Sequence, residues 1–473
     1  MQNAEPIWRL VDAKKEDFEA LSDRIWEAPE IAYNEYQAVA EHTAMLRQQG
    51  FRITESLAGI PTAVMGEAGE DGPIIAILGE YDALPGLSQE AGVAEPRPRA
   101  GDGMGHGCGH NLLGSAALLA ATAVKDWLTE HGLKGRVRYY GCPAEEGGAA
   151  KAFMVRAGCF DDVDIAITWH PMPFAGVNDA MSLANTRLDF TFHGRASHAA
   201  AAPHLGRSAL DAVELMNVGV NYLREHMPSD ARIHYAMLET GGIAPNVVQA
   251  RAKVRYAVRA RDITEMDALV ARVRKVADGA ALMTETRVEV AVISAVSNLM
   301  GNTPLEQAMH DNFSRLGPPP FDAADRAFAE QIRATLTPED IAAHYRRAGL
   351  PIRQDQPLSD AIVPLGLRGE PMLGSTDVGD VSWKVPLVQA DGATVAIGTP
   401  FHSWQLTAQG KSPLAKKGMV HVAKVMAGTA IDAIRDETLI ARAKADLAAR
   451  TRDTPYVCPI PDDVHPPIQR RSP

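Results

Sequence analysis

The strongest constraint on the fold is a recurring pattern in which a short apolar run is followed at once by polar or ionisable residues. The runs PIIAILG, RVRYYG, VDIAIT and ATVAIG are rich in β-branched and aromatic residues, which favour strands. The segments between them, such as LLGSAALLAATAVKDWL, have helical periodicity. Strands that alternate with helices predict an α/β domain whose sheet is mostly parallel.

Each of these runs leads into residues suited to metal binding or acid–base chemistry. The loops beyond the carboxyl ends of parallel strands converge, and ligands of open α/β sheets bind there. We therefore expect a functional site at this edge of the sheet. The residues that follow the four runs are Glu80, Tyr81 and Asp82, then Cys142, Glu145 and Glu146, then Trp169 and His170, and finally His402.

Residues 187–297 follow a different order. TRLDFTFHG predicts a strand, residues 207–225 a helix, RIHYAMLE and QARAKVRYAVRA two strands, residues 265–282 a second helix, and TRVEVAVI a last strand. This βαββαβ order is typical of a small ferredoxin-like domain. We predict a catalytic metal-binding domain from 1–186 and 298–440, an inserted lid or dimerisation domain over 187–297, and a C-terminal helix with a proline-rich tail over 441–473.

Length and composition exclude several classes of protein. A chain of 473 residues exceeds the roughly 250 to 300 at which single cores stop growing, so more than one domain is expected. No run approaches the ~18 apolar residues of a membrane span, and the N-terminal segment is typical of a charged amphipathic helix. The net charge of -12 favours small molecules over nucleic acid or anionic lipid as partners. The four scattered cysteines indicate a reducing, cytoplasmic location.

The segment GMGHGCGHN places His106, Cys108 and His110 within five positions of a glycine-rich loop. A catalytic thiol, a metal site and a disulfide would each use such residues, but so few cysteines argue against a disulfide. A thiolate and an imidazole are good ligands for Zn²⁺ and related ions. His106 is open as a metal ligand, a hydrogen-bond donor to a ligand or a substrate contact.

The neighbouring carboxylates Glu145 and Glu146 would be costly to bury together without cations. Beside the cysteine and the histidines expected at the same sheet edge, one carboxylate can coordinate a metal while its neighbour polarises a bound water. Two ions can then hold the nucleophile and a substrate oxygen together. The pattern indicates a dinuclear hydrolase.

Seven motifs in order resemble the metallopeptidase and amidohydrolase family that includes aminoacylase, carboxypeptidase G, hippurate hydrolase and the plant auxin-conjugate hydrolases. They are GHGCGHN, CPAEEGG, WHP, GRASHAAAAPHLGRSALDA, GGIAPNVV, GSTDVGDVSW and GTPFHSW. The resemblance covers nearly the whole chain and implies a dinuclear metallo-exopeptidase fold. It implies hydrolysis of the amide bond of an N-acyl amino acid, with p-aminobenzoyl-glutamate or a similar N-acyl glutamate as the expected substrate. It also implies a homodimer, or pairing with a homologous subunit.

The same resemblance implies a set of metal ligands. Cys108 would bridge two divalent ions, Mn²⁺ or Zn²⁺, at the place where many relatives use aspartate. His110, Glu146, His170 and His402 would complete the two coordination shells.

Further roles are implied for residues that do not bind the ions. Glu145 would be the general base that takes a proton from metal-bound water, and Asp82 would orient a ligand. His198 would steady the oxyanion in the active site of a partner subunit. Asn246 and Arg259 would hold the carboxylate and backbone of the substrate, for which the planar fork of arginine is well suited.

Two positions depart from the family pattern. Many relatives carry CGHD, whereas this chain has Asn111, which we expect to cap the following helix. Glu80 stands in GEYD where other branches have a histidine.

Three other functions stay open at this point. The chain could be a dipeptidase or an amidohydrolase of other specificity, a thiol hydrolase with Cys108 as nucleophile, or a non-catalytic subunit of a two-subunit hydrolase. The thiol mechanism leaves the two glutamates, His170 and His402 without a role.

Overall fold

The central sheet explains where the site residues meet. The computed structural model describes residues 6–101, 103–371 and 373–468, and within them this sheet has seven strands in the order β1-β2-β4-β3-β5-β11-β6. The pairs β4–β3, β3–β5 and β5–β11 are parallel, whereas β1, β2 and β6 pair antiparallel at the edges. The strands are β1 (Arg52–Glu55), β2 (Val64–Glu70), β3 (Ile74–Glu80), β4 (Gly135–Cys142), β5 (Ile165–Met172), β6 (Gly176–Val177) and β11 (Leu387–Ala393).

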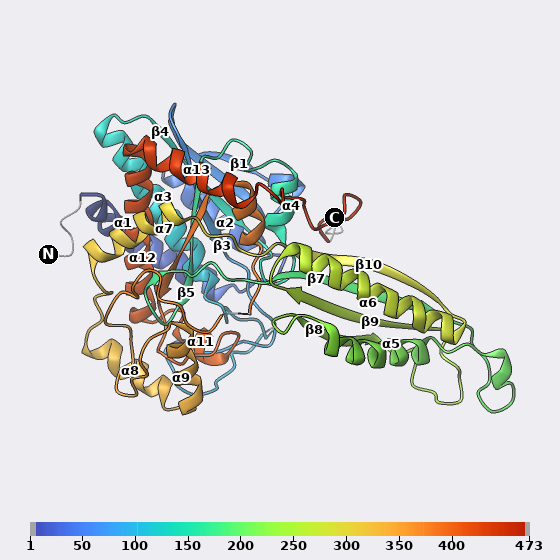
Figure 1. The fold of residues 1–473 in the computed structure, drawn as a ribbon. Coiled ribbons are helices and arrows are strands. Elements are labelled where there is room, and N and C mark those ends of the chain that lie inside the picture. Colours follow the sequence, from blue (N-terminus) through green and yellow to red (C-terminus); the bar gives the residue numbers. More distant parts are fainter. Residues whose placement is uncertain (1–5, 102, 372, 469–473) are drawn as a thin grey trace.

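Helices cover both faces of this sheet because its inner strands are apolar on both sides (Figure 1). In β3, Ile75 and Ile77 join the core beneath α1, α3 and α12, whereas Ile74 and Leu78 join the core beneath α4 and α10. The helices of the main domain are α1 (Pro6–Glu27), α2 (Tyr36–Gln48), α3 (His110–His131), α4 (Ala150–Arg156), α7 (Thr303–Leu316), α8 (Ala323–Arg333), α9 (Pro338–Arg347), α10 (Val378–Lys384), α11 (Trp404–Gln409), α12 (Pro413–Arg435) and α13 (Glu437–Arg450), with the short 3-10 turn η1 (Leu57–Gly59).

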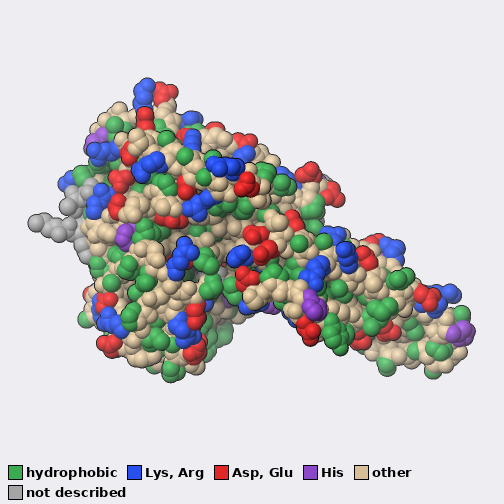
Figure 2. All heavy atoms as spheres, in the orientation of Figure 1, with side chains coloured by type: hydrophobic (Ala, Val, Ile, Leu, Met, Phe, Trp, Pro, Cys, Tyr) green, Lys and Arg blue, Asp and Glu red, His purple; other side chains and the backbone are tan. Residues whose placement is uncertain are grey.

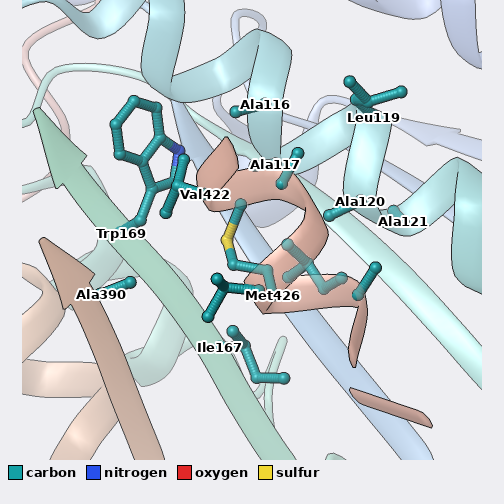
Figure 3. Packing of buried hydrophobic residues seen from close by; sticks show 14 of the residues in the cluster. Ala116, Ala117, Leu119, Ala120, Ala121, Ile167, Trp169, Ala390, Val422 and Met426 are labelled. Carbon is teal, nitrogen blue, oxygen red and sulfur yellow. The ribbon is translucent and has the colours of Figure 1, made fainter. Parts of the chain in front are cut away.

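Small side chains let α3 approach α12 and the sheet closely. Figure 3 shows Ala116, Ala117 and Ala120 of α3 near Val422 and Met426 of α12. All of these side chains are buried. Close packing of this kind holds the start of α3, which carries His110, in a fixed position on the sheet.

The inserted segment forms a second sheet that projects from the main body (Figure 1). Its strands are antiparallel in the order β10-β7-β9-β8, and its helices α5 and α6 pack on the sheet around one apolar core. The elements are β7 (Ala184–His193), η2 (Pro203–Leu205), α5 (Ala209–Leu223), η3 (Arg224–His226), β8 (Arg232–Glu239), β9 (Arg251–Ala260), α6 (Ile263–Thr284) and β10 (Arg287–Val296).

The predicted fold class is therefore confirmed: a mostly parallel α/β domain with an inserted βαββαβ unit. The division points 186, 297 and 440, and the lid or dimerisation role of the insert, stay predictions. Within the predicted tail, the part up to residue 468 lies against the main domain, where the Arg156 guanidinium donates to the carbonyls of Pro461 and Val464. Residues 469–473 of that tail lie outside the described residues.

Local predictions failed at three places. The run ATVAIG, residues 393–398, is a buried loop beyond its first residue, because the strand that precedes it is LVQADGA. His170 lies inside β5 rather than after it. Asn111 does not cap α3, since Gly109 holds that position at φ 77°, a backbone angle that favours glycine. The Asn111 amide instead donates to Ser22 and to the carbonyl of Gly410.

In the described ranges, no helix has the length and apolar character needed to cross a bilayer. The face in Figure 2 shows basic and acidic side chains interspersed.

Candidate metal centre

A cavity of about 490 Å³ lies where the carboxyl edge of the main sheet meets the second sheet. Residues from β3, the α3 entry loop, the β4–α4 loop, β5 and the loop after β11 line it, together with residues of β7, β9 and β10. Cys108, Glu145, Glu146, His170 and His402 all line this one cavity. The structure thus brings together residues separated by up to 294 positions, from 108 to 402.

Cys108 belongs to two groups of possible metal ligands. In the first, ligand atoms of Cys108, His110 and His170 all lie within 4.8 Å of one another, and Cys108 Sγ is 3.4 Å from His170 Nε2. In the second, Cys108, Glu146 and His402 meet the same limit, and His402 Nε2 is 3.3 Å from Glu146 Oε1. A thiolate common to both groups can bridge two cations.

Asp82 links two of these ligands. One carboxylate oxygen lies 2.9 Å from Nδ1 of His110, and the other accepts the backbone N–H of Glu146 at 2.9 Å. The remaining nitrogen of His110, Nε2, faces Glu80 at 3.4 Å. A carboxylate on the far nitrogen fixes the tautomer and the orientation of a metal-binding imidazole.

Glu145 is placed among other acids. Glu80, His110 and Glu145 form a third group of ligand atoms within 4.8 Å. Burial, then the charges of Glu80 and Glu146, raise the pKa of Glu145 well above its ordinary value. A carboxyl group with a raised pKa can hold and release a proton near neutral pH.

A buried lysine neutralises part of this acidic wall. Lys151 Nζ lies 2.6 Å from Glu80 and 2.6 Å from Asp377, and all three side chains are buried. Lys151 and Asp377 are functional candidates that sequence reasoning missed. Lys151 begins the helix that follows CPAEEGG, but nothing in the local pattern indicates its partner 226 positions later.

The donor set fits divalent cations on two further observations. Nε2 of His110 and Oε1 of Glu146 are buried without a hydrogen-bond partner in the described residues. Burial also raises the pKa of the Cys108 thiol, so the thiolate needs a cation beside it. The second observation weighs against a cysteine nucleophile, which requires a lowered pKa.

The residues predicted to bind substrate divide into two groups. Arg259 lines the cavity, and its Nη1 donates to the Ser375 hydroxyl at 3.1 Å. His198 and Asn246 do not line it. They lie together on the exposed surface of the inserted unit, where the N–H of Ala199 donates to the carbonyl of Asn246.

His106 is not among the groups of possible ligands found in the described chain. Its ring is buried, and Nε2 lies 3.1 Å from the carbonyl of Ile25. Burial lowers the pKa of His106 to about 3, which keeps the ring neutral. These contacts favour a role in packing the loop against α1.

Sequence reasoning also missed Arg187, which lines the cavity from β7. The alternation Asn185, Arg187, Asp189 marks a polar strand face and was the available signal. Trp383, whose large side chain makes it a natural candidate for a pocket wall, does not line this cavity.

This fold and this site define a metal-dependent hydrolase of amide bonds. The model of peptidase family M20/M25/M40 matches residues 76–386, and the chain belongs to this family. It is an enzyme of that class, and the family implies divalent metal ions at the site.

Individual relatives cover nearly the full chain. One of the two subunits of p-aminobenzoyl-glutamate hydrolase from Escherichia coli K12 is 45% identical, over 97% of this chain and 98% of the relative. An Xaa-Arg dipeptidase from Mus musculus is 28% identical, over 94% and 91%. A dinuclear metal-binding M20 peptidase structure from Bacillus subtilis has the same fold, with a TM-score of 0.56 and 18% identity over 88% of this chain and 98% of that one.

Proposed function

We propose that the protein hydrolyses the amide bond of an N-acyl amino acid that carries a free carboxylate, with p-aminobenzoyl-glutamate as the leading substrate. The observation that carries the proposal is that Cys108 belongs to two groups of metal ligands, with Glu145 beside them in one cavity. The 45% identity to the Escherichia coli hydrolase supports the choice of substrate.

The cavity residues would hold two divalent ions. Cys108 would bridge them, with His110, Glu146, His170 and His402 as the other ligands. When bound, such ions lower the pKa of water and polarise a carbonyl oxygen. Thiolate favours Zn²⁺, while the imidazoles and the carboxylate also suit Mn²⁺.

Glu145 would move the proton. It would take a proton from the attacking water and deliver it to the leaving amide nitrogen. Its raised pKa supports both transfers, because a group that holds its proton near neutral pH can also return it. Asp82 would keep His110 and the backbone of Glu146 in place during the reaction.

Arg259 would hold the α-carboxylate of the substrate with its guanidinium fork. His198 and Asn246 would act from a second copy of the chain, since both are exposed and neither lines the cavity of their own chain. His198 would there steady the oxyanion.

A surface for that second copy is present on the insert. β8 is an edge strand, and its side chains Tyr235, Met237 and Leu238 are exposed. Val218 and Tyr222 of α5 are exposed as well. An edge strand with apolar side chains can pair with another strand. We therefore propose a homodimer through this surface, located in the cytoplasm, where the four free cysteines would stay reduced.

Two alternatives remain distinct from this proposal. The likeness to an Xaa-Arg dipeptidase favours a dipeptide substrate. The likeness to a protein named as one subunit of two favours a chain that depends on a homologous partner.

The decisive experiment is a substrate panel on the purified chain with measured metal content. The panel contains N-acyl glutamates, N-acyl aspartates and dipeptides, including one that ends in arginine. We expect the highest kcat/KM for p-aminobenzoyl-glutamate. Faster cleavage of dipeptides would favour the first alternative, and no turnover at saturating Mn²⁺ or Zn²⁺ would favour the second.

A further inference from the structure

Two arginines of the inserted unit enter the cavity side by side. Arg187 lies on β7 and Arg259 on β9, and both line the cavity. In the antiparallel register Asn185 pairs with Arg259, so Arg187, two residues further, is its diagonal neighbour on the same face of the sheet.

Neither arginine forms an ion pair within the described residues. Arg187 donates Nη1 to the carbonyl of Gly147 at 3.2 Å, and Arg259 donates Nη1 to Ser375 at 3.1 Å. Nε of Arg259 is buried without a hydrogen-bond partner. Glu145 and Glu146 attract Arg187, but neither pairs with it.

Arg255 provides a comparison on the same face of β9. Its Nε pairs with Asp189 at 2.6 Å. The sheet thus supplies a carboxylate to Arg255, which does not line the cavity, and none to Arg187 or Arg259, which do. Buried charges without partners are costly, so a bound ligand is expected to supply the negative charges.

The backbone beside Arg187 is shaped to admit it. Gly147 has φ 137°, and a Cβ there would lie 1.9 Å from Nη1 of Arg187. Any larger residue would push the guanidinium away from the loop that carries Glu145.

We propose that this pair is a subsite for a dicarboxylic amino acid: Arg259 binds the α-carboxylate, and Arg187 binds the side-chain carboxylate of glutamate. This inference rests on the proposed function and deepens it. Arg187 is then the residue that selects an acidic amino acid. The same two charges repel a substrate that ends in arginine, which separates this chain from a dipeptidase of that specificity.

The test compares p-aminobenzoyl-glutamate with its neutral isostere p-aminobenzoyl-glutamine in three variants and the wild type. We expect wild-type kcat/KM to be about 100-fold higher for the glutamate substrate. Arg187→Gln should lose that preference, with a fall of about 100-fold on the glutamate substrate and less than about 3-fold on the other. Arg255→Gln is the matched control and should keep the preference. Arg347→Gln tests the remaining cavity arginine on α9.

A binding measurement covers the case of an inactive preparation. Calorimetric titration with free L-glutamate and L-glutamine should show tighter binding of glutamate to the wild type, and equal binding to Arg187→Gln. Retention of the preference in Arg187→Gln, or its loss in Arg347→Gln instead, would overturn the inference. A wild type that prefers glutamate in titration but cleaves no N-acyl amino acid would contradict the proposed function alone.

Discussion

Asp82 and His110 form the contact on which the metal centre depends: a carboxylate oxygen of Asp82 lies 2.9 Å from Nδ1 of His110. Both side chains are buried. The other oxygen of Asp82 accepts the N–H of Glu146, so one carboxylate positions ligands from two separate loops.

Replacing Asp82 by asparagine should therefore weaken metal binding. The amide keeps the size of the side chain but loses the charge that orients His110, and such losses reduce metal affinity roughly 10- to 100-fold. Competition with a chromophoric chelator measures the affinity. Asp278→Asn, at an exposed position on α6, is the control and should bind metal like the wild type. Equal affinity in both variants would remove Asp82 from the metal centre.

Removal of metal should abolish activity reversibly. Dialysis against a chelator should leave less than a few per cent of the wild-type rate, because ions at such sites lower the barrier by several kcal/mol. Addition of Mn²⁺ or Zn²⁺ should restore it, with two ions per chain by elemental analysis. Full activity in the metal-free protein would favour a thiol mechanism through Cys108.

The variant Glu145→Gln should keep its metal and lose its chemistry. A general base contributes about 10²- to 10⁴-fold to the rate, so kcat should fall by that factor while KM changes little. Elemental analysis of the variant checks that the metal content is unchanged. Glu437→Gln, at an exposed position, is the matched control. A fall in kcat of less than 10-fold would be inconsistent with the role proposed for Glu145.

Acid should destabilise the fold through His42. Burial lowers the pKa of His42 from its ordinary 6.5 to about 3, and its Nδ1 lies 2.9 Å from the Tyr139 hydroxyl. Below about pH 6.5 the unfolded chain binds a proton that the folded chain excludes, so the free energy of unfolding falls as pH falls towards 3. Between pH 7 and 4.5 the loss is on the order of 2 to 3 kcal/mol.

Urea unfolding at the two pH values measures this loss. His42→Gln should be less stable at pH 7 but should show a smaller pH dependence than the wild type. His204→Gln, at an exposed position, should retain the wild-type dependence. Identical pH dependence in all three proteins would exclude His42 as the cause.

Active sites that use His198 of a partner should be recoverable by mixing. His198→Ala and Glu145→Gln should each be nearly inactive alone. After unfolding and refolding together, half of the dimers would be mixed with one intact site each, giving about a quarter of wild-type activity. Sedimentation should show a dimer that Met237→Glu, on the exposed face of β8, disrupts. No recovery on mixing would place His198 outside the partner's site.

The sequence predicted much of the fold and the metal-binding residue types because both are local signals. Alternation of apolar runs identified β3, β4 and β5, and the βαββαβ order identified the insert. The same reasoning misplaced the strand before His402, since ATVAIG is as apolar as a true strand yet is buried as a loop. Burial alone does not separate the two.

The sequence by itself determined which chemistry the chain can perform: cysteine, histidines and paired glutamates in glycine-rich loops after strands. Only the tertiary structure decided how Lys151 meets Asp377 and how Arg187 meets Arg259 in the cavity. The reason is that such contacts depend on strand register and on the packing of one sheet against another. These relations join residues far apart in the chain, and no local pattern records them.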